Sequence, residues 1–214
     1  MHPRPRLILS LVALAAASGM LAGCAPSAPI EPAVTSSPTS SPALSPSATP
    51  EIQAVVISLD GASVDGGALV PFGDVDGLVA AFTDLFGTAP DESTVDGPYD
   101  SAYTAYEWAS VRVLVADARA TVTVSAEAPG VAFTTEQGIT LGSARAEALA
   151  AGAEDDWDEN GDGIADYLRI GMREVPGTQS LTTPGAVGIE YLTLKITDDV
   201  VSSISTGGND FSDI

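Results

Sequence analysis

The chain has 214 residues, of which 29 are aspartate or glutamate and only eight are lysine or arginine, and its formal net charge is −21 at pH 7. So acidic a surface repels nucleic acid and anionic lipid and attracts cations or basic partners, which excludes nucleic-acid binding. Cys24 is the only cysteine, so an internal disulfide is also excluded and the fold must depend on its hydrophobic core.

Residues 1–23 have the pattern of an export signal. The short basic start MHPRPR precedes an apolar run of secretory-signal length, with small residues before Cys24. This run is shorter than the roughly 20 apolar residues of a membrane-spanning helix, and glycines interrupt it. The sequence therefore predicts a protein that is exported from the cytoplasm.

The end of this signal, Leu21-Ala22-Gly23-Cys24, resembles the lipobox of bacterial lipoproteins. The resemblance implies that Cys24 receives a diacylglyceryl group and becomes the first residue after cleavage. It also implies a lipid anchor on the outer face of the bacterial cytoplasmic membrane, because two acyl chains are enough for stable anchoring. The alternative is an ordinary signal peptide in which the cysteine is incidental.

Residues 24–50 are expected to be the lipidated cysteine followed by a disordered tether. Proline, serine and threonine make up 17 of the 26 residues 25–50, and the apolar residues occur singly. Such a composition buries too little apolar surface to fold and favours extended, polyproline-like segments. The folded part is therefore predicted to begin near residue 51.

Residues 51–126 and 127–214 are predicted to be two repeat units. Each contains a 13-residue segment that begins and ends with glycine, Gly61–Gly73 in the first and Gly130–Gly142 in the second. Apolar residues in the two segments match at a constant offset of 69 positions. The second unit has 12 additional residues between its helix and its last hairpin, and the acidic stretch 157–168 lies in that interval.

A helical pattern follows each glycine-bounded segment. In the first unit, apolar residues recur with helical spacing over 75–86, Asp74 is placed as N-cap and Gly87 lies beyond the C-terminus. In the second unit, Ser143 is the expected N-cap of a shorter helix with an alanine-rich stripe. Each helix is expected to lead through a polar loop to a hairpin.

The expected hairpins are Val111–Val124 and Leu192–Ser205, in which apolar and polar residues alternate. Together these patterns predict an α+β fold: two repeated hairpin–helix–hairpin units that form antiparallel sheet, with the helices packed on one face. The step from Leu141-Gly142-Ser143 into the second helix also resembles the duplicated modules of β-lactamase inhibitory proteins. That resemblance implies protein binding through the sheet face and no catalysis.

The stretch WDENGDGIADYL, residues 157–168, resembles the loops of EF-hand-like and thrombospondin-type calcium sites. Calcium prefers six to eight oxygen ligands, and a loop supplies them from alternate residues when a glycine allows a sharp turn. Gly163 is at the turn position. The expected ligands are the side chains of Asp158, Asn160, Asp162 and Asp166 and the backbone carbonyl of Ile164.

The loop departs from an EF-hand at its twelfth position, where Arg169 replaces the bidentate carboxylate. Asp155 or Asp156 would then complete the shell, or the site would bind weakly and keep more water. The sequence therefore predicts a structural calcium site rather than a calcium sensor. The alternative is a solvated acidic loop without a metal.

Several kinds of catalysis are excluded by composition. His2 is the only histidine and lies in the signal, and Cys24 is the only thiol, which excludes Ser-His-Asp and Cys-His catalysis and histidine-ligated zinc. Carboxylate-only hydrolysis is left open, with Glu107, Asp156 and Glu190 as nominal candidates. We therefore predict no enzyme activity.

The sequence thus predicts a lipid-anchored binding or inhibitory module at the cell surface, whose partner is an unknown protein or glycan. Its predicted cofactor is a structural calcium ion, and its predicted membrane contact is the lipid on Cys24. The alternative function is a carboxylate-only hydrolase or a ligand-capture lipoprotein of a transport system.

Overall fold

The computed structural model describes residues 52–97 and 101–211. The predicted signal, Cys24 and the whole predicted tether lie outside these residues. In chain order the described elements are β1 (Gln53–Ile57), β2 (Gly61–Val64), β3 (Val70–Pro71), α1 (Val75–Phe86), β4 (Asp91–Asp96), β5 (Ala102–Glu107), β6 (Val111–Ala116), β7 (Arg119–Val124), β8 (Val131–Thr135), α2 (Arg145–Ala150), β9 (Glu154–Trp157), β10 (Tyr167–Glu174), β11 (Ile189–Thr197) and β12 (Val200–Asn209).

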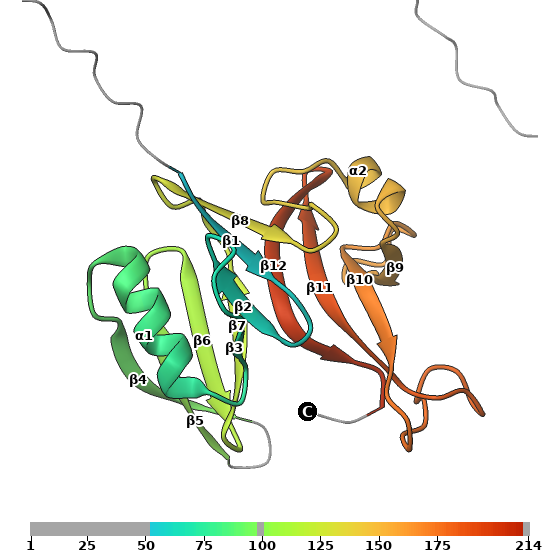
Figure 1. Cartoon of the computed structure of the whole chain (residues 1–214). Coiled ribbons are helices and arrows are strands. Elements are labelled where there is room, and N and C mark those ends of the chain that lie inside the picture. Colours follow the sequence, from blue (N-terminus) through green and yellow to red (C-terminus); the bar gives the residue numbers. More distant parts are fainter. Residues whose placement is uncertain (1–51, 98–100, 212–214) are drawn as a thin grey trace, which may run out of the picture. The chain divides into compact units, whose positions relative to one another are not determined.

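The strands form two sheets (Figure 1). The smaller sheet has the order β3-β2-β1-β8, and the larger has the order β4-β5-β6-β7-β12-β11-β10-β9. The larger sheet therefore consists of two meanders of four consecutive strands, which meet where β7 pairs with β12. In the smaller sheet β1 runs parallel to β8, with Gln53 opposite Val131. The two halves of the chain are thus joined in both sheets.

The predicted fold class, an α+β fold with helices packed on one face of antiparallel sheet, is wrong. The described chain is mostly β structure, with two sheets, one parallel strand pair and two helices of 12 and six residues. The polar stretches 91–96 and 154–157, which were expected to be loops, are the outermost strands β4 and β9. Nearly all their side chains are exposed, so they lack the apolar–polar alternation that signals a strand with one buried face.

The first helix, α1, is confirmed at its predicted position. The Asp74 carboxylate accepts a hydrogen bond from the Gly77 N–H at 3.0 Å, which caps the N-terminus. Gly87 ends the helix in the left-handed conformation with φ 65°. Leu78 and Phe82 are buried on its apolar stripe, so α1 is held by packing as well as by its caps.

The second helix, α2, is shorter, and its predicted cap is wrong. Ala144, not Ser143, is the N-cap residue, and the Ser143 hydroxyl accepts the Thr140 N–H at 3.1 Å instead. The Glu147 carboxylate accepts the Ala144 N–H at 2.9 Å, which satisfies one donor at this end. Ala148 is the only buried residue of α2, so its alanine stripe provides little apolar surface to hold a longer helix.

One hydrophobic core joins the two sheets and the helices. In Figure 1 the smaller sheet lies between α1 and α2, in front of the eight-stranded sheet. The centre of the larger sheet contributes a continuous row of cross-strand neighbours, each at most 2 % exposed: Val111, Val124, Ile204, Leu194 and Leu168. This row crosses the β7–β12 junction without interruption. The face of the sheet that points away from the smaller sheet is hereafter called the open face.

Among the described residues, no helix is both long enough and apolar enough to cross a membrane.

Ile204→Ala tests the importance of the β7–β12 junction. Ile204 is 1 % exposed and lies opposite Val124 across the junction, so we expect the substitution to lower the free energy of unfolding by about 2 to 5 kcal/mol. Ser203→Ala, one residue away on the open face, should change it by less than about 0.5 kcal/mol. Urea unfolding of the two variants checks this, and equal midpoints would contradict the assigned role of the junction.

Candidate functional site

The predicted calcium residues lie on the loop between β9 and β10, which form a hairpin at one edge of the larger sheet. Asp158 accepts hydrogen bonds from the N–H groups of Gly161 at 2.7 Å and Gly163 at 2.8 Å. Asp166 accepts the N–H of Glu159 at 2.8 Å and of Asn160 at 3.2 Å. The two carboxylates thus hold the loop in a compact turn by satisfying its backbone donors.

The other two expected side-chain ligands also bond within the loop. Asn160 accepts the Asp162 N–H at 2.9 Å through its carbonyl oxygen, and its amide nitrogen donates to Asp166 at 3.2 Å. Asp162 accepts the N–H of Ile164 at 2.8 Å. Gly163 has φ 89°, a conformation that glycine adopts without strain. Asp158, Asn160, Asp162 and Asp166 therefore belong to one local network.

This network is not a preformed cage of carboxylates. Among the described residues, three or more aspartate, glutamate, histidine or cysteine side chains do not come together in a way that could hold a metal ion. Asp155, one of the two side chains considered as additional ligands, already has a basic partner. Asp155 forms an ion pair with Arg145, and Arg169 pairs with Glu154 at 2.9 Å. Calcium binding at this loop thus stays a prediction.

An open depression of about 590 Å³ lies beside the loop. Asp162 and Asp166 line it from the loop, and Asp198 and Asp199 line it from the β11–β12 turn. The two basic residues in its wall are Arg145 and Lys195. The Arg145 guanidinium donates to the carbonyl of Ala165 and pairs with Asp155, which ties the loop to α2.

The open face carries a second row of cross-strand neighbours, one position away from the buried row, as expected when side chains alternate between the faces. We call it the open-face row. From β5 to β9 it consists of Glu107, Arg112, Thr123, Ser205, Thr193, Arg169 and Glu154.

The two ends of the open-face row are charged and its centre is hydroxylic. Arg112 pairs with Glu107 at 2.9 Å at one end, and Arg169 pairs with Glu154 at 2.9 Å at the other. In the centre, the hydroxyl oxygens of Thr123 and Ser205 lie 2.5 Å apart across the β7–β12 junction. The row therefore offers donors and acceptors on neighbouring strands across most of the sheet.

Tyr191 is another buried polar group of this half of the sheet. It is 8 % exposed, and its hydroxyl donates to the carbonyl of Asn209 at 3.4 Å. Burial raises the pKa of Tyr191 to about 12, and the negative charge of Asp156 contributes to this rise. Tyr191 is therefore a neutral hydrogen-bonding group at neutral pH rather than a base.

The three nominal carboxylates for hydrolysis lie on different strands. Glu107 is on β5 and Asp156 is on β9, six strand spacings of about 4.8 Å apart along the sheet. Glu190, on β11, pairs with Arg173 at 2.6 Å. The structure therefore does not bring Glu107 together with the other two as a catalytic pair.

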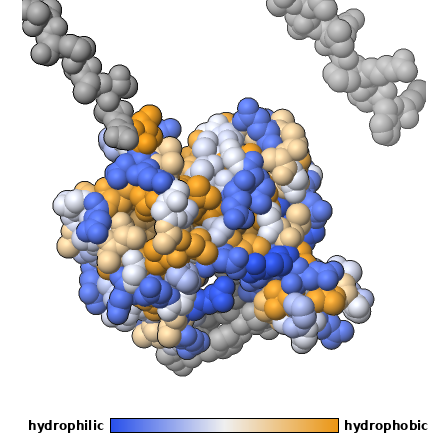
Figure 2. All heavy atoms as spheres, in the orientation of Figure 1, coloured by the Kyte–Doolittle hydropathy of each residue, from blue (hydrophilic) through white to orange (hydrophobic). Residues whose placement is uncertain are grey.

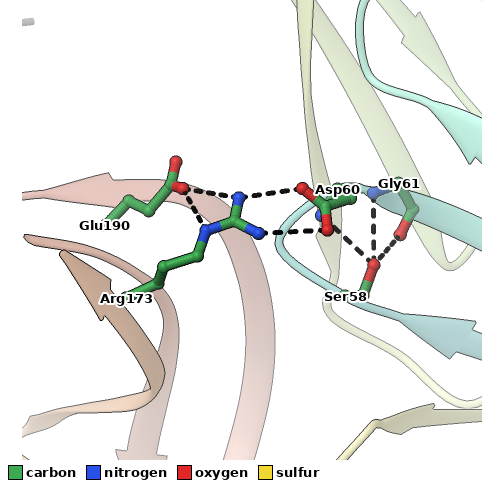
Figure 3. A network of polar contacts seen from close by, with 5 residues as sticks. All are labelled: Ser58, Asp60, Gly61, Arg173 and Glu190. Atoms are coloured by element: carbon green, nitrogen blue, oxygen red, sulfur yellow. Dashed lines mark hydrogen bonds and ion pairs between the residues drawn. The ribbon is translucent and has the colours of Figure 1, made fainter. Parts of the chain in front are cut away.

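A polar network that the sequence did not suggest connects the two sheets (Figure 3). The Arg173 guanidinium on β10 donates to both carboxylate oxygens of Asp60, at 2.8 and 3.1 Å, and to Glu190 at 2.8 Å. Asp60 lies in the β1–β2 turn, and Glu190 lies at the start of β11. These hydrogen bonds raise the pKa of Arg173 above its ordinary value. We call this network the Arg173 clamp.

The β1–β2 turn is shaped so that it presents Asp60 to Arg173. The buried Ser58 hydroxyl accepts the N–H groups of Asp60 and Gly61, each at 3.2 Å, and donates to the Gly61 carbonyl at 3.0 Å. Gly61 is required there, because a Cβ atom would lie 2.1 Å from the Val70 carbonyl oxygen. The hydrogen bond from Arg173 is the largest influence on Asp60 and holds its pKa below the ordinary value.

The Arg173 clamp borders a small hollow of about 270 Å³. Asp60, Arg173, Glu190 and Arg119 contribute its polar wall, and Phe72 contributes an apolar one. Figure 2, in the orientation of Figure 1, shows strongly hydrophilic residues beside a hollow in the lower middle of the view. Sequence reasoning missed the clamp because Asp60 and Arg173 are 113 residues apart and neither belongs to a local motif.

No protein-family model, curated protein or solved structure matches this chain.

The Arg173 clamp predicts a pH-dependent coupling between Asp60 and Arg173. Asp60→Asn and Arg173→Gln in a double-mutant cycle should show a coupling of about 0.5 to 1 kcal/mol at pH 7, a modest value because both side chains are about half exposed. The pKa of Asp60 is lower in the folded than in the unfolded state. The coupling free energy is therefore fully present above the unfolded-state pKa of about 3.9, and it is lost as the pH falls through the folded-state pKa.

Urea unfolding at pH 7 and at successively lower pH measures the coupling. Glu127→Gln, which changes an exposed acid outside the clamp, should show none with Arg173→Gln. A coupling between Asp60 and Arg173 that stayed constant from pH 7 to pH 2 would contradict the assigned ion pair.

Proposed function

We propose that this protein is an exported, lipid-anchored binding module that contacts a protein or glycan through the open face of its eight-stranded sheet. The observation that carries the proposal is the open-face row. It extends over seven neighbouring strands, and its side chains are half-buried or exposed. The opposite face of the same sheet is occupied by the core.

The chemistry of the open-face row suits recognition better than bond cleavage. Its arginines and glutamates form ion pairs with each other, so each charge already has a partner of opposite sign. The hydroxyl groups in its centre can both donate and accept hydrogen bonds. A surface with many such groups supports a specific, polar interface.

The lipid on Cys24 is the proposed anchor, and the proline-, serine- and threonine-rich residues 25–50 are the proposed tether. This part of the proposal rests on the lipobox resemblance and on composition, since these residues lie outside the described ones. A tethered module at the outer face of the membrane is positioned to meet partners that are themselves exported or on the cell surface.

We also propose that the loop 158–166 binds calcium as a structural ion. Four oxygen-bearing side chains already belong to one hydrogen-bonded turn, and each carboxylate oxygen can accept a further interaction. The ion would draw Asp158, Asp162 and Asp166 together and remove the repulsion between them. A site that needs this rearrangement should be weak, with a dissociation constant of about 10⁻⁴ to 10⁻³ M.

Calcium should therefore stabilise the folded chain. At ten times its dissociation constant the ion adds about 1.4 kcal/mol to the free energy of unfolding, and magnesium should add less because it demands tighter octahedral geometry. Asp162→Ala should abolish the effect, whereas Glu127→Ala, a remote exposed acid, should preserve it. Thermal unfolding at constant ionic strength measures this. Identical curves in calcium and sodium, with no heat of binding up to about 10 mM calcium, would leave only a solvated loop.

A photo-crosslinking amino acid placed on the open face tests the binding function. At Thr193, in the centre of one half of the open-face row, it should yield a defined crosslinked product on the producing cells, because a bound partner would cover this position. The control is the same amino acid at Glu136, which is exposed in the turn that follows β8. Crosslinking at Glu136 but not at Thr193, or equal crosslinking at both, would contradict the open face as the binding surface.

A further inference from the structure

The strand β9, with sequence EDDW, ends the eight-stranded sheet at one edge. It pairs with β10 on one side, and among the described residues no strand pairs with its other side. All four of its residues are exposed. A strand of this kind leaves backbone N–H and C=O groups free to pair with another chain.

The acidic residues of β9 do not by themselves distinguish this edge. Glu154 pairs with Arg169, and Asp155 pairs with Arg145, so two of its three carboxylates already have a basic partner within the chain. The unusual residue of β9 is Trp157, which is 63 % exposed. A tryptophan side chain carries a large apolar surface, and an exposed one marks a contact site more often than a scattered small apolar residue does.

Trp157 begins a row of neighbours on the open face. It lies opposite Tyr167 on β10, which lies opposite Lys195 on β11. The Lys195 ammonium is 5.2 Å from the centre of the Tyr167 ring and 3.9 Å from Glu159. In this row, therefore, the ring of Tyr167 already holds a cation from the next strand. Trp157 belongs to the edge strand, beside the position that a further strand would occupy.

We propose that β9 accepts an extended basic segment of a partner as an additional strand, with a lysine or arginine side chain over the ring of Trp157. This inference rests on the proposed binding function and names the class of partner. A cation is attracted to the face of an indole, which is the strongest of the aromatic rings in this respect. Backbone pairing supplies affinity and the side chain opposite Trp157 supplies selectivity, as in other cases of strand addition.

Charge complementarity favours a basic segment over other extended chains. The formal net charge is −21, so a basic segment is drawn to the protein at long range and an acidic one is repelled. The opposite edge of the sheet, β4, is equally exposed and acidic, with sequence DESTVD. It has no aromatic residue over which a cation could lie. We therefore assign the docking to β9 alone.

Selection from a phage-displayed library of random nine-residue peptides tests this proposal on the full-length protein in detergent at physiological ionic strength. The wild type should enrich peptides that contain lysine or arginine between β-branched residues. Trp157→Ala should bind the best of these peptides about fivefold more weakly, as expected for the loss of about 1 kcal/mol of cation–π attraction. Leu181→Ala, which removes an apolar residue of similar exposure elsewhere, should bind them as the wild type does.

Two further measurements separate strand addition from simple charge attraction. N-methylation of alternate amides on one edge of the selected peptide should abolish binding, whereas N-methylation on the other edge should not. Equal binding by the wild type and Trp157→Ala, insensitivity to N-methylation on both edges, or no enrichment of basic peptides would each overturn the proposal. Such a result would leave the open face intact as the binding surface if Thr193 still crosslinks to a partner.

Discussion

The pairing of β7 with β12 is the interaction on which the rest of this structure depends. Only two pairs of residues define its register, Val124 with Ile204 and Thr123 with Ser205. The first pair is buried and continues the apolar row from one meander into the other. The second pair lies on the open face. The same short contact thus joins both the core and the surface of the two meanders.

Additional interactions also hold the two halves of the fold together. The Val122 N–H donates to the buried Thr206 hydroxyl at 2.9 Å, which satisfies a backbone donor where the ladder ends. The parallel pairing of β1 with β8 joins the same two halves in the smaller sheet. The Arg173 clamp then connects the smaller sheet to β10 and β11. Because all of these contacts join residues that are distant in the sequence, their formation requires the whole described fold.

The sequence predicted the parts of the fold whose signals are local. The helix α1 was predicted correctly because its apolar spacing, Asp74 and Gly87 all lie within 14 consecutive residues. The sequence also showed β6 and β7, since every second residue of each strand is apolar and the core buries that face, with Val111 and Val113 in β6 and Val122 and Val124 in β7. It did not show β4 or β9, because an edge strand with nearly all its side chains exposed has no alternation to detect. The parallel β1–β8 pair has no local signal at all.

The candidate site divides in the same way. The oxygen-bearing residues of the loop 158–166 were found because they are close in sequence, and the structure places them in one hydrogen-bonded turn. The open-face row could not be found, because its seven residues come from seven strands and are adjacent only once the register is known. The Arg173 clamp was missed for the same reason. Long-range pairing, rather than residue type, was the information that the sequence did not supply.

Because the fold has few basic residues, the proposed binding of calcium and of a partner would depend on positive charge that the ion and the partner supply. Six lysines and arginines lie among the described residues, and five of them form ion pairs there: Arg112, Arg145, Arg169, Arg173 and Lys195. All five are already engaged in holding the sheet, the loop or the clamp. The large excess of carboxylates therefore has no basic group left within the fold to balance it, apart from Arg119. The proposed calcium ion at the loop and the proposed basic segment at β9 would both supply positive charge to the same half of the sheet. A basic partner would therefore be attracted by the negative charge that the fold itself does not neutralise.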